Sequence, residues 1–392
     1  MTVHQVLCIN CGSSSLKFAL IEPASGRVER HGLAERLGTK DASLKLDGGA
    51  SERLAPGSDH AAALDKILEL VDQSQLLAVG HRVVHGGERF SESVRIDEEV
   101  LAGIEACSAL APLHNPANLV GIQAARARFP ELPQVAVFDT AFHHRMPPKA
   151  YFYAVPYELY TRYELRRYGF HGTSHRYVAE EAAARLERPI EELMLLTAHL
   201  GNGCSACAVS GGRSVDTTMG LTPLEGLVMG TRSGDVDPNL HDFLAQRSEM
   251  SLSEITELLN RKSGLLGLSG ESNDMRTLLA ARESGSERAR LAIDVFCYRL
   301  AKGLLGLCAA LRRVDALVFT GGIGEHAAPI RAQTLRELAV LGAEVDDALN
   351  QEHGRSVKGR ITTSESRLLS LVIPTHEELV IAREAARLAN PT

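Results

Sequence analysis

The feature that most constrains the fold is a unit of strand, glycine turn and strand that occurs twice, far apart in the chain. The first copy spans Cys8 to Leu20 and the second spans Thr197 to Val209. In both copies an apolar run with β propensity ends at glycine, and a second apolar run follows, although few residues are identical. A unit repeated at this separation is typical of a duplicated fold. The sequence therefore predicts two structurally similar halves.

Strand-like and helical segments alternate along most of the chain, which is typical of α/β proteins. Strands are expected at 5–10, 16–21, 77–80, 134–138, 194–200, 315–320 and 368–373, and helices near 59–72, 97–109, 116–128, 174–186, 238–247, 251–260, 271–283, 287–313 and 377–389. A Pro- and Tyr-rich stretch from Arg145 to Tyr163 interrupts the alternation. We therefore expect two lobes, one of residues 1–148 plus 379–392 and one of residues 149–378.

Composition and charge exclude several classes of function. Lys and Arg total 42 against 49 Asp and Glu, a formal charge of -7, so no nucleic-acid partner is expected. The longest late apolar stretch, Gly303 to Leu311, is too short to span a bilayer, so no membrane partner is expected. The N-terminus shows no basic leader followed by an apolar block, and seven cysteines fit no disulfide framework. These features predict a cytoplasmic protein with reduced thiols.

Two Cys-x-x-Cys pairs, Cys8 with Cys11 and Cys204 with Cys207, raise the alternative of a zinc site. Each pair lies in or beside a strand-like run. Residues three apart in a strand point to opposite faces, so neither pair is well placed to chelate. The sequence favours reduced, unligated thiols over zinc.

Three glycine-rich turns each follow an apolar strand: Asn10 to Ser15, His199 to Gly203, and Gly321 to Glu325. Such a turn presents backbone N–H groups without an intervening Cβ, which suits a phosphate. One turn alone would more often be an ordinary turn, but three in comparable positions favour nucleotide phosphates. No Walker motif and no dinucleotide-binding glycine motif occurs, so both of those enzyme classes fit poorly.

Polar residues gather in four short segments that we expect to lie at strand ends, namely 80–87, 138–144, 169–175 and 229–235. Arg82 and Arg232 are candidates for clamping a carboxylate and a phosphoryl group, because a guanidinium matches both anions. An ordinary ion pair is the alternative for either arginine. Asp139 ends an apolar strand, so it is expected to meet an arginine or a metal-bound water.

His171 and His175 have the four-residue spacing of a metal pair on one helix face. Gly172 and Thr173 between them suggest a loop and a helix cap, which disfavours zinc. The residues are better explained if His171 donates a hydrogen bond to transition-state charge while His175 supports the loop.

These segments together resemble a known family. Residues 10–18 and 167–175 look like the two signature stretches of acetate kinases, and residues 80–87, 229–238 and 321–325 are similar as well. The resemblance to the acetate and propionate kinase group spans about residues 5–385. It implies a duplicated actin-like (ribonuclease H-like) α/β fold, with a cleft between an N-terminal lobe that contacts the acyl substrate and a C-terminal lobe that binds the nucleotide. It also implies ATP or ADP, Mg²⁺ with Mn²⁺ as an alternative, acetate as the second substrate, and a homodimer.

The resemblance also implies roles for individual residues. The resemblance implies that the catalytic residues are Arg82, Asp139, His171 and Arg232. The acyl-binding residues would be Arg82, Val84, Leu113, Phe170 and Pro223, and the residues that organise the metal would be Asn10 and Glu377. The nucleotide-binding residues would be Lys17, His199, Leu200, Gly201, Asn202, Gly203, Asp274, Met275, Arg276, Gly322 and Ile323. Cys11 and His376 depart mildly from the family pattern, in which a small residue and Asn are common.

The implied reaction is reversible, Mg²⁺-dependent, direct in-line transfer of the ATP γ-phosphoryl group to acetate. One alternative is a propionate or other short-chain acyl kinase, because a single methylene contributes only ~1–3 kcal/mol of discrimination. The other is an actin-like ATPase that switches partners, although that role gives no reason for Arg82, Asp139, His171 and Arg232 together.

Overall fold

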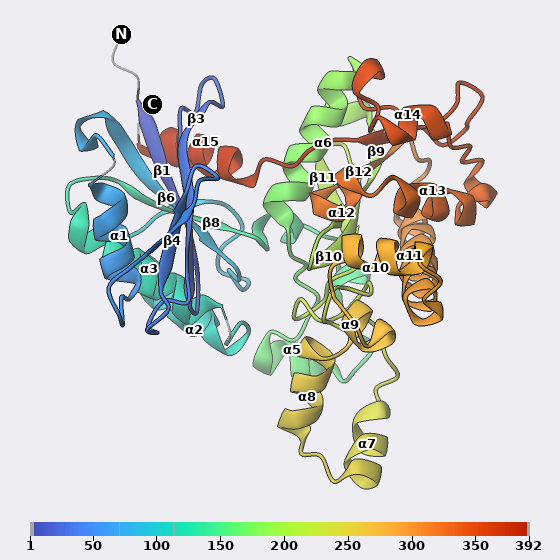
Figure 1. The fold of residues 1–392 in the computed structure, drawn as a ribbon, viewed down its shortest axis with the longest axis horizontal. Coiled ribbons are helices and arrows are strands. Elements are labelled where there is room, and N and C mark those ends of the chain that lie inside the picture. Colours follow the sequence, from blue (N-terminus) through green and yellow to red (C-terminus); the bar gives the residue numbers. More distant parts are fainter. Residues whose placement is uncertain (1–3, 70, 113, 390–392) are drawn as a thin grey trace. The chain divides into compact units, whose positions relative to one another are not determined.

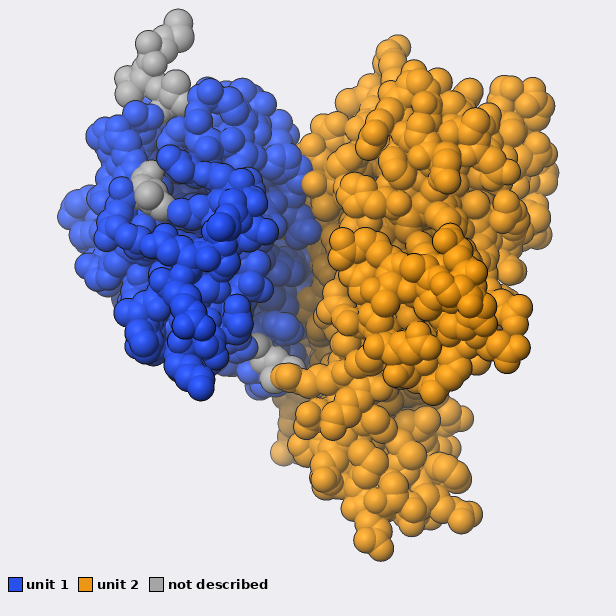
Figure 2. Space-filling view, in the orientation of Figure 1, with its two compact units in different colours: residues 1–144, 376–392 blue, residues 145–375 orange. Residues whose placement is uncertain are grey.

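The computed structural model describes residues 4–69, 71–112 and 114–389. The chain divides into two compact units, which Figure 2 draws in different colours. Unit 1 comprises residues 1–144 and 376–392, and unit 2 comprises residues 145–375. These units begin and end within a few residues of the two lobes expected from the sequence, whose assignment as acyl-binding and nucleotide-binding lobes stays a prediction.

Unit 1 is built on a mixed sheet with the strand order β5-β4-β3-β2-β1-β6-β8-β7. Its strands are β1 (Gln5–Gly12), β2 (Ser15–Ile21), β3 (Val28–Glu35), β4 (Ser43–Leu46), β5 (Ser51–Arg53), β6 (Leu76–Val83), β7 (Val94–Arg95) and β8 (Gln134–Phe138). Strands β1 to β5 form an antiparallel meander, whereas β6 is parallel to both β1 and β8. Gly12 pairs with Ser15, so the first glycine turn is the tight hairpin that the sequence predicts.

Successive side chains of a strand point to opposite sides of a sheet, so both faces of this sheet carry side chains that need covering. Different helices cover the two faces. Leu7, Ile9 and Phe18 share a buried cluster with residues of α1 (His60–Leu68) and α3 (Asn115–Arg128). α2 (Glu98–Ala106) packs beside α3. α15 (Glu377–Ala389) returns from unit 2 and packs on β1, β6 and β8 (Figure 1). Two chain segments far apart in sequence thus build one core.

Unit 2 repeats the central topology of unit 1. Its strands are β9 (Met194–Leu200), β10 (Cys204–Ser210), β11 (Arg213–Thr217), β12 (Ala316–Thr320) and β13 (Ser370–Val372), in the order β11-β10-β9-β12-β13. The first three form an antiparallel meander, and β9, β12 and β13 run parallel. The order β3-β2-β1-β6-β8 in unit 1 has the same connectivity and directions. The predicted duplicated α/β fold is confirmed.

Unit 2 carries most of the helices. They are α4 (Pro148–Tyr151), α5 (Tyr157–Tyr163), α6 (Gly172–Leu186), α7 (Leu240–Ser248), α8 (Leu252–Arg261), α9 (Gly264–Ser269), α10 (Met275–Glu283), α11 (Glu287–Leu307), α12 (Gly321–His326), α13 (Ala328–Glu337) and α14 (Asp347–Gln351). The long helix expected at 287–313 ends at Leu307. No helix in the described part of the chain is long and apolar enough to cross a bilayer.

Two local predictions are wrong. Gly321 to Glu325 is expected to be a turn, but these residues begin α12 directly after β12. Gly321 has φ +74°, and a Cβ there would lie 2.8 Å from the carbonyl oxygen of Leu200, so only glycine allows this abrupt entry into a helix. Gly172 and Thr173 are the first residues of α6, and His171 is its N-cap with φ +56°.

Gly80 on β6 is predicted to control how closely α15 approaches the sheet. A Cβ at Gly80 would lie 2.5 Å from Cγ2 of Ile381, so Gly80→Ala is expected to lower the free energy of unfolding by about 1–3 kcal/mol through overpacking. Chemical denaturation measures the change. Gly306→Ala in α11 is the matched control, because no atom lies within 4 Å of its added Cβ, and it should leave stability unchanged or raise it by up to ~1 kcal/mol. Equal effects of the two substitutions would contradict the packing argument.

Candidate active site

Asn10, Arg82 and Asp139 come together at one edge of the unit 1 sheet. They lie at or just beyond the carboxyl ends of β1, β6 and β8, three adjacent parallel strands. The register pairs Ile9 with His81 and Arg82 with Val137, which places the three polar residues side by side. Ligands of open α/β sheets bind at this edge.

Arg82 and Asp139 form a two-point ion pair. Nε of Arg82 donates to Oδ1 of Asp139 at 3.0 Å, and Nη2 donates to Oδ2 at 2.5 Å. The Asp139 carboxylate is buried and the Arg82 side chain is mostly buried. Burial lowers the pKa of the guanidinium, but the carboxylates of Asp139, Glu377 and Glu378 raise it more, so the pKa lies above its ordinary value. Arg82 is therefore a fixed positive charge, and its third nitrogen, Nη1, lies 3.4 Å from Oδ1 of Asn10.

The first turn of α15 brings two carboxylates to this group. Glu377 lies close enough to Arg82 to raise its pKa. Glu378 pairs with Nζ of Lys17, whose side chain is half exposed. Lys17 thus belongs to unit 1 and is held by a carboxylate.

The predicted metal residues offer suitable donors. Mg²⁺ prefers oxygen ligands and usually keeps several waters and substrate phosphates in its coordination shell. Asn10 and Glu377 supply an amide oxygen and a carboxylate next to the same arginine. Across residues 4–69, 71–112 and 114–389, no group of three or more His, Cys, Asp or Glu side chains gathers at metal-binding distance. An amide oxygen and a carboxylate are donors of the kind that Mg²⁺ prefers.

In unit 2, His171 is anchored by a chain of hydrogen bonds. Its Nδ1 lies 2.8 Å from Oγ of Ser205, which lies 2.8 Å from Nε2 of His175. Nδ1 of His175 in turn lies 2.7 Å from Oγ1 of Thr197. Ser205, His175 and Thr197 are fully buried. Because this chain engages Nδ1, Nε2 is the nitrogen of His171 that faces the glycine loop.

His171 and Arg232 converge on Gly203. A Cβ at Gly203 would lie 3.3 Å from Nε2 of His171 and 3.4 Å from Nη2 of Arg232. Nη1 of Arg232 donates to the carbonyl oxygen of Pro223 at 2.7 Å. The loop after β9 therefore has an imidazole and a guanidinium directly against its backbone, an arrangement suited to an anion that gains charge.

A pocket of about 430 Å³ opens beside this loop. Seven of its lining residues are predicted nucleotide-binding residues: Gly201, Asn202, Asp274, Met275, Arg276, Gly322 and Ile323. Asp274 caps α10 by accepting from the backbone N–H groups of Arg276 and Thr277. A hydrogen bond from the Arg276 side chain lowers the pKa of Asp274 to about 2. The pocket is large enough for a nucleoside and holds a fixed carboxylate at its rim.

The remaining predicted residues of the loop lie next to this pocket. The ring of His199 lies 4.3 Å from that of His171, centroid to centroid, and its Nδ1 lies 2.8 Å from Oγ of Ser174. Leu200 is buried at the end of β9. The structure therefore brings His199 to Gly203 together with His171 and Arg232 in one unit.

The predicted acyl-binding residues are divided between the units. Val84 is buried just beyond β6 in unit 1. Phe170 is buried and Pro223 half-buried in unit 2. The backbone N–H groups of Tyr168 and Gly169 donate to the carbonyl oxygen of Gly220, which joins the segment before Phe170 to the one that carries Pro223. Leu113 lies outside the described residues.

Two of the four polar segments are not at strand ends. Residues 169–175 enter α6 from a loop, and residues 229–235 lie in a stretch without helix or strand. The strand-end prediction used local sequence alone, whereas both segments are held by contacts between residues distant in sequence. Nδ1 of His171 lies 2.8 Å from Oγ of Ser205, and the backbone N–H of Gly230 donates to the carbonyl oxygen of Asn202 at 3.0 Å.

Sequence reasoning missed three polar residues of the site: Ser174, Ser205 and Asn273. Ser205 pairs with His199 in the β9–β10 register. A strand residue opposite a predicted loop histidine was a usable signal, because register partners lie about 5 Å apart. Asn273 donates to Oδ1 of Asn202 at 3.0 Å, and it directly precedes Asp274.

Known proteins are similar to this chain over nearly its whole length. The model of the acetokinase family matches residues 5–383. An acetate kinase from Deinococcus radiodurans is 58% identical over 386 residues, which is 97% of each chain. An acetate kinase from Ectopseudomonas mendocina is 55% identical and covers 99% of this chain and 100% of its own.

Two solved structures are similar over nearly the whole chain. A propionate kinase from Francisella tularensis has a TM-score of 0.94 at 45% identity and covers 98% of this chain and 100% of its own. An acetate kinase from Porphyromonas gingivalis has a TM-score of 0.92 at 42% identity, with coverage of 99% and 100%. Since the family model and these relatives extend over both units, the chain belongs to the acetokinase family.

Proposed function

We propose that this chain transfers the γ-phosphoryl group of ATP to the carboxylate of acetate, forming acetyl phosphate and ADP in a reversible, direct in-line reaction. The observation that carries the proposal is the convergence of His171 and Arg232 on Gly203, beside a pocket lined by the predicted nucleotide-binding residues. The full-length likeness to proteins named acetate kinase supports the choice of acceptor.

The reaction has to overcome repulsion between two anions. A carboxylate must approach a γ-phosphoryl group whose oxygens share several negative charges. Catalysis of phosphoryl transfer rests mainly on positioning and on fixed positive charge. In this proposal Arg82 from unit 1 and Arg232 from unit 2 supply that charge.

His171 and the glycine loop would act on the transferring group. The Nε2 nitrogen of His171 would donate a hydrogen bond to the phosphoryl oxygens as they gain charge. The loop from Gly201 to Gly203 would bind the polyphosphate, and the segment from Asp274 to Arg276 would bind the nucleoside. Asp139 would hold the Arg82 guanidinium in orientation through its two hydrogen bonds.

Asn10 and Glu377 would hold Mg²⁺, with Mn²⁺ as an alternative, in part through water. The ion would neutralise phosphate charge when bound. Both residues lie next to Arg82. Because Asp139 already pairs with Arg82, the arginine would keep its position whether or not the metal is bound.

A propionate kinase is the second candidate, since the structure with a TM-score of 0.94 carries that name. Val84, Phe170, Pro223 and Leu113 are the residues we assign to the acyl chain. One methylene changes binding by only ~1–3 kcal/mol, so a preference for acetate over propionate rests on small differences in this pocket. We further propose a homodimer in the cytoplasm, the state that the family resemblance implies.

Acetyl phosphate formation is the direct test. The purified chain with ATP, Mg²⁺ and acetate is expected to give acetyl hydroxamate when hydroxylamine is added, and the yield should vanish without Mg²⁺. The ratio of kcat/KM for acetate, propionate and butyrate then assigns the acyl preference. Hydrolysis of ATP without any hydroxamate would contradict the proposal and favour an actin-like ATPase.

Removal of either arginine is expected to lower turnover greatly while the fold persists. Arg82→Ala and Arg232→Ala should each lower kcat by at least about 100-fold, the loss typical when a group that stabilises transition-state charge is deleted. Arg247→Ala is the matched control, because Arg247 is an exposed residue of α7 outside the proposed site. Circular dichroism verifies the fold, and near-normal turnover of either variant would contradict the assignment.

Ser205→Ala tests the anchoring of His171. Loss of the shared hydroxyl leaves Nδ1 of His171 and Nε2 of His175 without this partner, so we expect kcat to fall about 10- to 100-fold. The KM for ATP should change little, because Ser205 does not line the nucleotide pocket. Steady-state kinetics with Ser248→Ala, an exposed serine of α7, provide the control. A change in KM alone would show that the hydrogen-bond chain serves binding rather than turnover.

A further inference from the structure

Arg232 lies in a segment that has no regular structure to hold it. Residues 218–239, all of them described, form neither helix nor strand between β11 and α7. The guanidinium of Arg232 donates to the carbonyl oxygen of Pro223 in the same segment. The backbone beside Arg232 is held by hydrogen bonds such as that from the N–H of Ser233 to the carbonyl oxygen of Leu259. The orientation of the guanidinium depends in addition on what fixes the backbone around Pro223.

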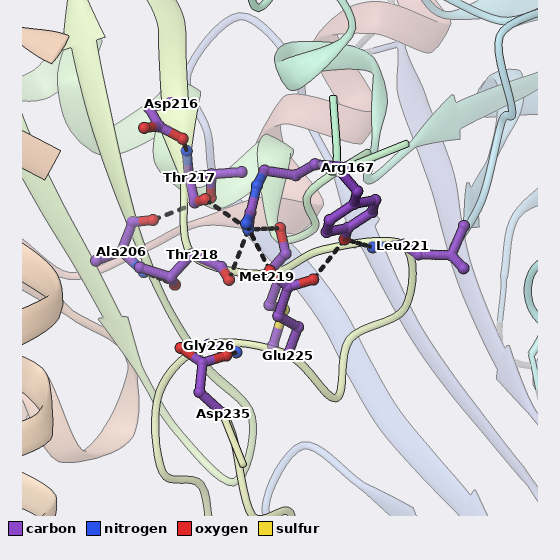
Figure 3. Close-up of polar contacts among 11 residues, drawn as sticks. Arg167, Ala206, Asp216, Thr217, Thr218, Met219, Leu221, Glu225, Gly226 and Asp235 are labelled. Carbon is purple, nitrogen blue, oxygen red and sulfur yellow. Dashed lines mark hydrogen bonds and ion pairs between the residues drawn. The ribbon is translucent and has the colours of Figure 1, made fainter. Parts of the chain in front are cut away.

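Arg167 is hydrogen-bonded to the start of this segment (Figure 3). Its Nη1 donates to three successive carbonyl oxygens, those of Thr217 at 3.0 Å, Thr218 at 3.0 Å and Met219 at 3.1 Å. Its Nη2 donates to Oε1 of Glu225 at 2.5 Å. The guanidinium of Arg167 is thus hydrogen-bonded to both ends of the stretch from Thr217 to Glu225. The Arg167 side chain is only 19% exposed.

Tyr153 closes the network from the other side. Its hydroxyl donates to Oε2 of Glu225 and accepts from the backbone N–H of Leu221 at 2.8 Å. Burial and the neighbouring Glu225 raise the pKa of Tyr153, so the phenol remains a donor. A Cβ at Gly220 would lie 1.6 Å from Oε2 of Glu225 and 2.3 Å from the Tyr153 hydroxyl, so a side chain there would break the network.

The far side of the segment is fixed by two hydrogen bonds between Gly226 and Asp235. The N–H of Gly226 donates to Oδ1 of Asp235 at 2.7 Å, and the N–H of Asp235 donates to the carbonyl oxygen of Gly226 at 2.9 Å. The stretch between Glu225 and Asp235 is therefore a closed loop with Arg232 inside it. Its base is attached to Arg167 through Glu225.

We propose that Arg167 is a positioning residue for the phosphoryl transfer. It holds the segment from Thr217 to Glu225 so that the Pro223 carbonyl orients the Arg232 guanidinium toward Gly203. The inference rests on the proposed function, because it assigns Arg167 to the reaction in which Arg232 acts. A lysine cannot replace it, since a single ammonium cannot reach three carbonyls and a carboxylate in fixed geometry.

Kinetics of Arg167→Met and Arg167→Lys test the proposal. We expect Arg167→Met to lower kcat for acyl phosphate formation on the order of 100-fold, the loss that a misplacement of about 1 Å produces. The KM for ATP should stay within about threefold, and Arg167→Lys should recover only part of kcat. Arg162→Met, an exposed arginine of α5, is the matched control. Guanidinium ion added to Arg167→Ala is expected to restore part of kcat, which a purely structural loss would not allow.

A double substitution separates positioning from other roles. If Arg167 acts through Arg232, Arg167→Met should cause little further loss of kcat in the Arg232→Ala background. Equal losses in both backgrounds, or a normal kcat in Arg167→Met, would overturn the proposal. Tyr153→Phe keeps the ring and removes one hydrogen bond, so it should show a smaller loss of kcat with a nearly unchanged melting temperature.

The wild-type chain distinguishes the two levels of inference. No acyl phosphate from the wild type would overturn the proposed function and this role of Arg167 together. An active wild type with an unaffected Arg167→Met would overturn only the role of Arg167.

Discussion

Repulsion between two anionic substrates is the constraint on which the proposed site depends. Positive groups must stay in place before either substrate arrives, because an arginine that reorganises during the reaction would lose most of its effect. The structure meets this demand by tying each guanidinium to fixed acceptors. Arg82 is held by the buried carboxylate of Asp139, and Arg232 by the carbonyl of Pro223. Neither is free to fold back onto a surface carboxylate.

The proposed function would use the duplicated topology for two different chemistries. In unit 1 the carboxyl ends of β1, β6 and β8 carry side chains, Asn10, Arg82 and Asp139. In unit 2 the equivalent strands β9 and β12 are followed by glycines, Gly201 and Gly321, whose backbone N–H groups donate to the Gly203 carbonyl oxygen and to the Glu325 carboxylate. Side-chain charge suits a small carboxylate and a metal, whereas glycine, which has no Cβ, lets a polyphosphate approach the backbone closely. One fold would thus give an acceptor half and a donor half through different residues at equivalent strand ends.

Local sequence predicted the elements whose pattern is local. The β1–β2 hairpin, the repeat at β9–β10 and the burial of Asp139 all follow from short apolar runs that end in glycine or a polar residue. The entry into α12 could not be predicted, because Gly321 takes its positive φ against the Leu200 carbonyl, 121 positions earlier in the chain. The role of Arg167 could not be predicted either, although the residue belongs to the 167–175 stretch, because loop folding brings its carbonyl partners Thr217 to Met219 from 50 to 52 positions away.

The irregular segment around Arg232 needs glycines in backbone conformations that other residues rarely adopt, and ordering these glycines costs conformational entropy. Gly234 has φ +66°, and a Cβ there would lie 2.4 Å from the carbonyl oxygen of Leu227. Gly226 has φ +106°, and its Cβ would lie 2.5 Å from the carbonyl oxygen of Thr218. Glycine loses more conformational entropy on folding than any other residue, so two such positions destabilise the segment unless other contacts compensate. The four hydrogen bonds of Arg167 contribute to that compensation from outside the segment, together with backbone bonds such as those from Ser233 to Leu259 and from Gly230 to Asn202. The order of the segment therefore depends in part on the chain just before His171.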